Sequence, residues 1–286
     1  MRRSARTTPT SRRPPDGAAA ESVRAVPGVR LDRLDALRTV AMVWMTVFHF
    51  CFDLNFLGLI AKQNFYADPF WTWQRTAIVS LFLFTAGVSQ AVALQSQGLT
   101  SAPWRQRLDA RFWRRWAQVA GCALLVTAGS AIVFPRSYID FGVLHGLAVM
   151  LVVARLSAGW GHWLWLAGGL AVALKLIAAY ALPESATWQF FNEIPGRWLG
   201  LISRKPVTED YVPLVPWLAA VWWGLAVGQW VLRRCPHWLS GAASGEAPGA
   251  SSAWLRGLAA PGRWSLSYYM LHQPVLIGLL LAWRAL

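Results

Sequence analysis

The sequence predicts an all-α polytopic membrane protein, a bundle of about seven transmembrane helices with its N-terminus in the cytoplasm. The chain of 286 residues is 56% hydrophobic and contains 19 tryptophans, and long, mostly apolar runs recur along it. A helix needs about 20 such residues to cross a hydrocarbon core of about 30 Å. The runs are continuous, whereas strands of a membrane β-barrel would alternate apolar and polar residues over about ten positions. The hydrophobicity therefore predicts helices that span a membrane.

The apolar runs predict seven spans, together with two segments that lie outside the membrane. Residues 1–30 are rich in Arg, Pro, Ser and Ala without an apolar period, which is typical of a disordered basic tail. Residues 235–262 include a Gly-, Ala- and Ser-rich stretch, which predicts a flexible cytoplasmic linker within a membrane domain of residues 31–286. We expect the spans at residues 36–60, 70–94, 112–134, 139–157, 160–182, 212–232 and 264–283.

The positions of the arginines predict the orientation. The formal net charge is +14, and arginines cluster before the first span, between the second and third spans, and between the sixth and seventh. Cytoplasmic loops of membrane proteins carry an excess of Lys and Arg. We therefore expect a multi-pass protein of a bacterial inner (cytoplasmic) membrane, in contact with membrane lipids. Because topology explains the charge, we do not expect nucleic acid as a partner.

The first span carries ionisable residues at a depth where they are costly. Arg38 and His49 are eleven positions apart, so they lie on nearly the same side of a helix, and Asp53 follows His49 by one turn. Such residues within a span mark functional paths or sites. Asp53 is an i,i+4 neighbour within hydrogen-bonding reach of the His49 ring. We expect a buried polar track here, with a structural histidine held between helices as the plainer alternative for His49.

Further polar residues fall in or near the outer half of other spans. Asp140 and His145 lie at the outer start of the fourth span, Asp210 precedes the sixth, and His272 and Gln273 lie within the seventh. Each has a plainer interpretation, the aspartates as helix caps and His272 as a polar contact between helices. The three cysteines show no paired spacing, so we expect neither a disulfide framework nor a metal site.

Several stretches resemble known membrane acyltransferases. The run from Leu34 to Arg38, followed by His49, resembles the opening signature of the acyltransferase-3 type, although Thr39 stands where that signature usually has glycine. The runs at 80–89, 111–115 and 262–275 are similar to the second helix, the basic loop and the closing helix of those enzymes. The runs at 140–146 and 210–217 resemble the bacterial branch of the heparan-α-glucosaminide N-acetyltransferase catalytic domain, whose uncharacterised members carry a domain-of-unknown-function label.

The resemblance implies an integral membrane acyltransferase that moves an acetyl or other acyl group from acetyl-CoA to a hydroxyl or amino group of a saccharide or lipid-linked acceptor. Such a transfer needs a base for the acceptor's proton, and histidine titrates near neutrality. Guanidinium groups suit the phosphates of the donor, while the orientation alone also explains the same arginines. We expect catalytic roles for His49, Asp53, His145 and His272, donor binding by Arg38, Arg111, Arg114 and Arg115, and substrate binding by Asp140, Asp210 and Gln273.

Two other classes of function are compatible with the same residues. A transporter or lipid flippase would use the polar stripe as a path for a proton or a solute. A non-enzymatic membrane subunit would need the polar residues for helix packing alone. The sequence leaves open whether the protein forms a homo-oligomer.

Overall fold

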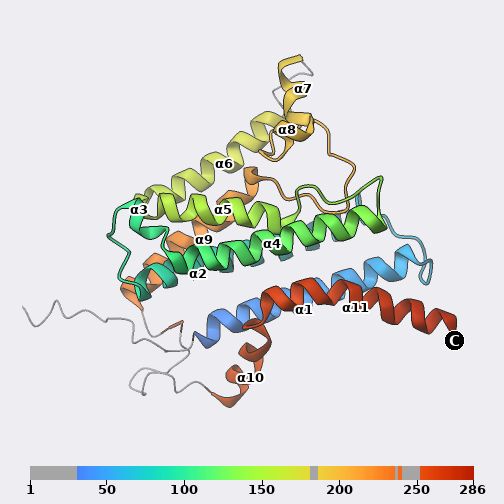
Figure 1. Ribbon diagram of the computed structural model, residues 1–286, viewed down its shortest axis with the longest axis horizontal. Helices are drawn as coiled ribbons and strands as arrows, with labels where there is room; N and C mark the ends of the chain where they lie inside the picture. The colour runs from blue at the N-terminus through green and yellow to red at the C-terminus, as the bar shows by residue number, and fades with distance from the viewer. Residues whose placement is uncertain (1–30, 181–185, 236–237, 240–251) are drawn as a thin grey trace, which may run out of the picture.

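The computed structural model describes residues 31–180, 186–235, 238–239 and 252–286, which form a bundle of long, roughly parallel helices (Figure 1). Short helices connect or flank the long ones: α3 (Trp104–Arg107), η1 (Ala158–Trp160), α7 (Ala186–Asn192), α8 (Ile194–Arg197) and α10 (Ala253–Gly262). The long helices are α1 (Asp32–Phe56), α2 (Pro69–Ser96), α4 (Ala110–Val133), α5 (Val143–Ser157), α6 (Trp163–Tyr180), α9 (Leu214–Arg234) and α11 (Ser265–Ala285).

The expected all-α membrane bundle is confirmed. Within the described residues, six helices are long and apolar enough to cross a membrane, namely α1, α2, α4, α5 with η1, α9 and α11, and α6 contains a shorter apolar stretch, Trp163–Ala179. These are the seven hydrophobic segments expected from the sequence, and the first begins at residue 32 where residue 36 was expected. The chain is therefore a multi-pass membrane protein.

Side-chain caps fix the starts of several helices. The Asp68 carboxylate accepts a hydrogen bond from the Phe70 N–H at the start of α2, and Pro69 occupies the first turn. Asp109 caps α4 in the same way by accepting from the Phe112 N–H. Each cap supplies an acceptor for one of the N–H groups that a helix start leaves without a partner. The turns between spans thus define where the helices begin.

The centre of the bundle is the contact of α2 with α9, which α5 also joins. Leu83 of α2, Met150 of α5 and both Val221 and Leu225 of α9 have at most a trace of exposed surface. Gly87 allows α2 and α9 to approach closely, because it has no side chain. A Cβ at this position would lie only 2.1 Å from the Val221 carbonyl oxygen. Close approach of helix backbones through small residues is the usual packing mode within membranes.

The helices α1, α10 and α11 form a second unit beside this core (Figure 1). A Cβ on Gly262 would lie 2.0 Å from the Asp35 carbonyl oxygen and 3.0 Å from Thr39 Oγ1, so the junction of α10 and α11 packs directly on the backbone of α1. Residues 1–30 and 240–251 of the expected tail and linker lie outside the described residues. At its C-terminal end, however, the expected linker is helical, because Ser252 caps α10 and the helix packs on α1.

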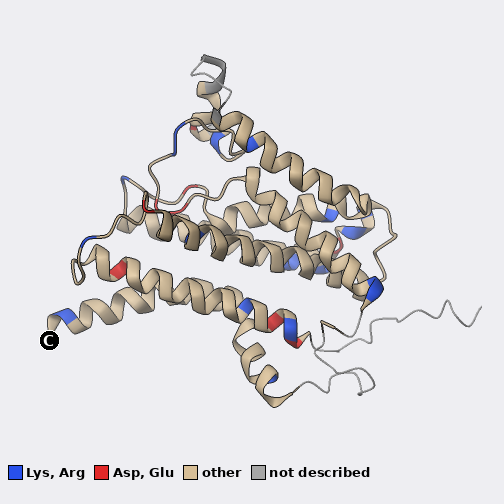
Figure 2. Cartoon of the chain, turned by 180° about the vertical axis from the view of Figure 1, so that it is seen from behind, with Lys and Arg blue, Asp and Glu red and all other residues tan. Residues whose placement is uncertain are grey.

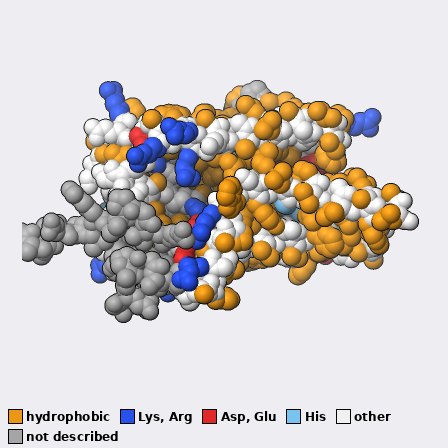
Figure 3. Space-filling model, turned by 60° about the horizontal axis from the view of Figure 1, so that its bottom comes forward, with side chains coloured by type: hydrophobic (Ala, Val, Ile, Leu, Met, Phe, Trp, Pro, Cys, Tyr) orange, Lys and Arg blue, Asp and Glu red, His pale blue; other side chains and the backbone are white. Residues whose placement is uncertain are grey.

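Charged side chains lie mainly toward the two ends of the bundle, with largely uncharged helix middles between them (Figure 2). On one face, Lys and Arg gather around the end at which α1 begins, and hydrophobic side chains cover most of the rest (Figure 3). By the positive-inside rule, the end at which α1 begins is the cytoplasmic one. The ends of α2, α5 and α9 and the starts of α4 and α11 lie at the same side (Figure 1).

Candidate functional site

The first and last long helices bring four of the expected site residues together. The His49 ring of α1 and the His272 ring of α11 contact each other edge to face, with centroids 5.1 Å apart and planes at 75°. One turn further along, Gln273 Nε2 of α11 donates a hydrogen bond of 2.8 Å to Asp53 Oδ1 of α1. Residues more than 200 positions apart in the sequence thus form one polar cluster, which we call the α1–α11 cluster.

The hydrogen bonds of His272 identify its reactive nitrogen. Its Nδ1 lies 2.7 Å from the Tyr269 carbonyl oxygen, which is an acceptor only, so the proton of the neutral ring is on Nδ1. The lone pair is therefore on Nε2, a buried atom that has no hydrogen-bond partner among the described residues. A neutral imidazole whose second nitrogen has no hydrogen-bond partner is suited to accept a proton or an acyl group.

Two further atoms of the cluster have unused hydrogen-bonding capacity. Asp53 Oδ2 and Gln273 Oε1 are buried acceptors without a donor in the described part of the chain. The expected hydrogen bond between the His49 ring and the Asp53 carboxylate is not formed; Asp53 Oδ1 accepts from the Gln273 amide of the neighbouring helix. A buried acceptor without a donor costs about 1–3 kcal/mol. Three such atoms from neighbouring residues are therefore the mark of a site that a polar group completes.

Two tyrosines of α11 hold His272, and sequence reasoning missed them. The Tyr268 ring is parallel to the His272 ring, and its hydroxyl is 2.6 Å from Thr46 Oγ1 of α1. Tyr269 orients His272 through its carbonyl group and packs against the same ring. Both tyrosines precede His272 by about one helical turn, and this i−3, i−4 spacing is a signal that could have identified them.

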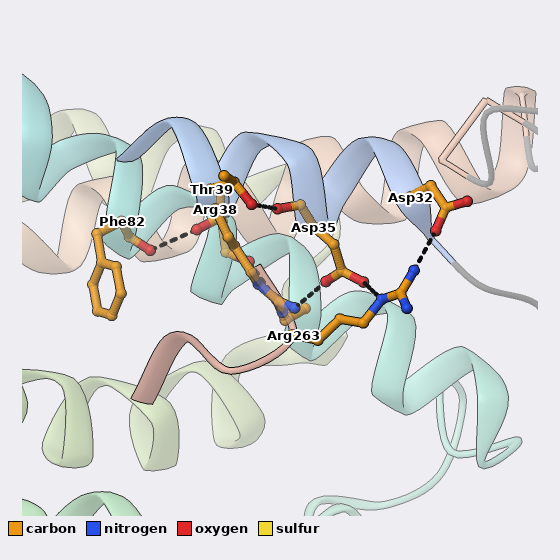
Figure 4. Close-up of polar contacts among 8 residues, drawn as sticks. Asp32, Asp35, Arg38, Thr39, Phe82 and Arg263 are labelled. Carbon is orange, nitrogen blue, oxygen red and sulfur yellow. Dashed lines mark hydrogen bonds and ion pairs between the residues drawn. The ribbon is translucent and has the colours of Figure 1, made fainter. Parts of the chain in front are cut away.

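The cytoplasmic end of α1 carries a different kind of polar cluster (Figure 4). Arg38 Nη1 pairs with Asp35 Oδ1 at 2.7 Å, and its Nη2 donates to Ser89 Oγ of α2. Arg263, at the junction of α10 and α11, pairs with the buried Asp32 at 3.2 Å and lies 3.9 Å from Asp35. We call these four charged residues the α1 ion-pair cluster. Sequence reasoning found Arg38 but missed Ser89 of α2 and Arg263 of the α10–α11 junction.

The other expected donor-binding residues lie at the start of α4. Arg111, Arg114 and Arg115 are exposed at the cytoplasmic end, and Arg115 acts electrostatically on Arg38. Their side chains are available to an anion in the cytoplasm. Arg38, in contrast, is already engaged by Asp35 and Ser89.

The expected residues of the fourth and sixth spans lie in a cluster of outer loops. His145 Nδ1 accepts from the Gly142 N–H at 3.3 Å, so its Nε2 carries the proton and donates to Thr127 Oγ1 at 3.0 Å. Both ring nitrogens are thus used to fix the start of α5. Asp140 pairs with Arg197 of α8 through one oxygen, at 2.6 and 2.7 Å. Its other oxygen, Oδ1, is buried without a partner among the described residues.

Asp210 links this outer cluster to the start of α5 and to α11. Its Oδ2 accepts a 2.7 Å hydrogen bond from the Val143 N–H, and a Cβ on Gly142 would lie only 2.3 Å from that oxygen. Burial raises the pKa of Asp210 to about 6, against the lowering effects of the Val143 hydrogen bond and of Arg75. The carboxyl group also acts electrostatically on Tyr269 of α11. As expected for the plainer interpretation, Asp210 caps a helix, although the helix is α5 rather than α9.

A comparison with protein families gives one match. The family model described as "Heparan-alpha-glucosaminide N-acetyltransferase, catalytic" matches residues 30–274, which include both the α1–α11 cluster and the α1 ion-pair cluster. No match was found among curated proteins or among solved structures.

Proposed function

The chain belongs to the family of heparan-α-glucosaminide N-acetyltransferase catalytic domains and is thus a membrane protein of the acetyltransferase type, and from this premise we propose its reaction. The protein transfers an acetyl group from acetyl-CoA in the cytoplasm to an amino or hydroxyl group of a saccharide or lipid-linked acceptor at the outer face. The membrane in question is the inner membrane of a bacterium.

The observation that carries this proposal is the pair of histidines between α1 and α11. Attack of an acceptor hydroxyl or amine on a thioester carbonyl requires a base for the acceptor's proton. His272 Nε2, which has no partner among the described residues, takes that proton, and the departing thiolate of CoA receives it when the thioester bond breaks. His49, edge to face with His272, is the second imidazole of the site, either as a base or as a transient acyl carrier.

The acceptor's hydrogen-bond donors have matching groups in the same cluster. Asp53 Oδ2 and Gln273 Oε1 both need donors, and a sugar amine or hydroxyl supplies them. On the outer side, Asp140 and Asp210 remain candidates for contacts with the rest of the acceptor. His145 would have to leave Thr127 to take part in the chemistry, so we assign it to positioning the start of α5.

The donor's phosphates are proposed to lie against the exposed arginines at the start of α4. Arg111, Arg114 and Arg115 face the compartment that contains acetyl-CoA. Planar guanidinium groups bind phosphate oxygens in pairs. Arg38 lies on nearly the same side of α1 as His49. Along the helix it comes between the cytoplasmic end and the α1–α11 cluster.

The test is acetyl transfer by the purified chain in liposomes, with acetyl-labelled CoA and a membrane extract or glucosamine as acceptor. The wild type should transfer the label, and His49→Ala should reduce the transfer by at least about 100-fold. His162→Ala is the matched control, because His162 is an exposed histidine beside Trp163. Full activity of His49→Ala would reject its role. Solute flux without any transfer of the label would favour the transporter.

A further inference from the structure

A buried arginine of α5 lies at the cytoplasmic end of the bundle, outside the sites described above. Arg155 is only 2% exposed, and its guanidinium lies over the Phe112 ring at 5.1 Å. Its Nε donates to Gln90 Oε1 at 2.6 Å and its Nη1 to the Arg107 carbonyl oxygen at 2.9 Å. A longer contact of 3.4 Å joins Nη1 to Gln97 Oε1. All of these acceptors are uncharged.

A second buried arginine, Arg107, is joined to Arg155 through its backbone carbonyl group. Arg107 of α3 is 9% exposed, and its Nε is buried without a hydrogen-bond partner in the described part of the chain. The group rests on the backbone of η1, because a Cβ on Gly159 would lie 2.7 Å from Arg107 Nη2. The absence of a side chain at Gly159 therefore makes the room that the guanidinium occupies.

The two guanidinium groups lack a direct counter-charge. Neither arginine forms an ion pair with any of the residues that the structure describes. The carboxylate that acts electrostatically on Arg155 is that of Asp109, whose side chain is already used to cap α4. Buried charges in proteins are normally paired, since removing them from water is costly. The arrangement is that of a cation site that awaits an anion.

We propose that Arg107 and Arg155 form a binding site for a phosphate group, separate from the exposed arginines at the start of α4. Arg107 supplies the Nε–H that has no partner among the described residues, and Arg155, which binds the Arg107 carbonyl oxygen, supplies a second buried positive charge. Guanidinium forks match phosphate oxygens, and the site lies at the cytoplasmic membrane boundary. Two phosphates occur there, those of coenzyme A and those of anionic phospholipid headgroups. The site does not depend on acetyl transfer, because binding of either can be measured without turnover.

The experiment uses the full chain in nanodiscs and two probes. In phosphatidylcholine nanodiscs, the affinity for CoA is measured by equilibrium binding. In nanodiscs that contain phosphatidylglycerol, the amount of that lipid retained on the protein is measured by native mass spectrometry. The variant is Arg107→Ala, which keeps the carbonyl group that Arg155 needs. Arg234→Ala removes an exposed arginine from the same side of the membrane and controls for the loss of one charge.

Each result decides the proposal. A loss of about tenfold or more in CoA affinity for Arg107→Ala, but not for Arg234→Ala, supports the site and assigns it to the donor. Loss of retained phosphatidylglycerol with unchanged CoA affinity supports the site and assigns it to a lipid. If Arg107→Ala equals Arg234→Ala with both probes while its unfolding temperature stays that of the wild type, the site does not exist. Arg107→Lys, which keeps charge but not the fork, should bind with intermediate affinity, and binding as weak as that of Arg107→Ala would show a requirement for the fork itself.

Discussion

Helix α1 carries two polar clusters that differ in how far their atoms are satisfied. At its cytoplasmic end, Asp35 and Arg38 pair with each other, Asp32 pairs with Arg263, and Ser89 accepts from Arg38. In its outer half, the α1–α11 cluster leaves Asp53 Oδ2, Gln273 Oε1 and His272 Nε2 without partners among the described residues. The partner of α1 is the α10–α11 junction in the first cluster and α11 itself in the second. The comparison teaches that the first contact uses its polar groups to hold helices together, whereas the second leaves hydrogen-bonding groups unused, as the proposed substrate site requires.

The largest effect is expected from the outer cluster and should fall on activity alone. His272→Ala removes the unpartnered nitrogen and should reduce acetyl transfer by at least about 100-fold, with little change in thermal stability. The double variant of His272→Ala and His49→Ala should transfer acetyl groups no more slowly than the less active of the two single variants. The effects of residues that act as a unit do not add. Leu271→Ala, at a neighbouring lipid-facing position that is 61% exposed, is the control. Independent, additive losses would show that the two rings do not work together.

A second effect should fall on stability at the junction of α10 and α11. Gly262→Ala places a Cβ 2.0 Å from the Asp35 carbonyl oxygen, so the junction must move away from α1. We expect a loss of up to about 3 kcal/mol in the free energy of unfolding, measured by denaturant titration in detergent. Gly257→Ala, in the same helix, meets nothing within 4 Å and should be neutral or slightly stabilising. Equal behaviour of the two variants would contradict the close packing.

The α1 ion-pair cluster provides a smaller change in stability. Arg263→Gln removes an ion-pair partner of the buried Asp32 and should cost about 1–2 kcal/mol in unfolding free energy. The acetyl transfer of the protein that remains folded should stay near that of the wild type, because the cluster is satisfied without a substrate. Arg284→Gln, at an exposed position near the far end of α11, gives the baseline. A selective loss of transfer would mean that the cytoplasmic cluster also takes part in the reaction.

The smallest expected effect is a pH dependence of stability that arises from Asp210, a carboxyl group outside the membrane spans. The pKa of Asp210 is raised to about 6, so its contribution to stability is full below its ordinary pKa near 3.8 and is lost as the pH rises through 6. Asp210→Asn keeps an acceptor for the Val143 N–H but cannot ionise. The variant should therefore gain on the wild type by about 1 kcal/mol between pH 5 and pH 7.5. Unfolding temperatures of both proteins measured across this range test the prediction. A variant that gains stability relative to the wild type as the pH falls would contradict it.

The sequence predicted the helices well because hydrophobic length is a local property. All seven spans and the shared face of Arg38, His49 and Asp53 follow from composition and from the helical repeat. The sequence could not show that Gln273 would donate to Asp53, since that depends on how α11 packs beside α1. For the same reason, it could not show that Arg107 and Arg155 are buried. Helix α10 was missed because its ten residues follow a Gly- and Ser-rich stretch.

The placement of the histidines on the first and the last long helix has a consequence for biogenesis. A ribosome inserts the spans one after another, and His49 waits in the bilayer until six further hydrophobic segments have entered. Only the arrival of α11 supplies the second imidazole and the amide that meets Asp53. A nascent chain released early would therefore contain most of the bundle but only the α1 half of the α1–α11 cluster, so the proposed reaction would be impossible until synthesis is nearly finished.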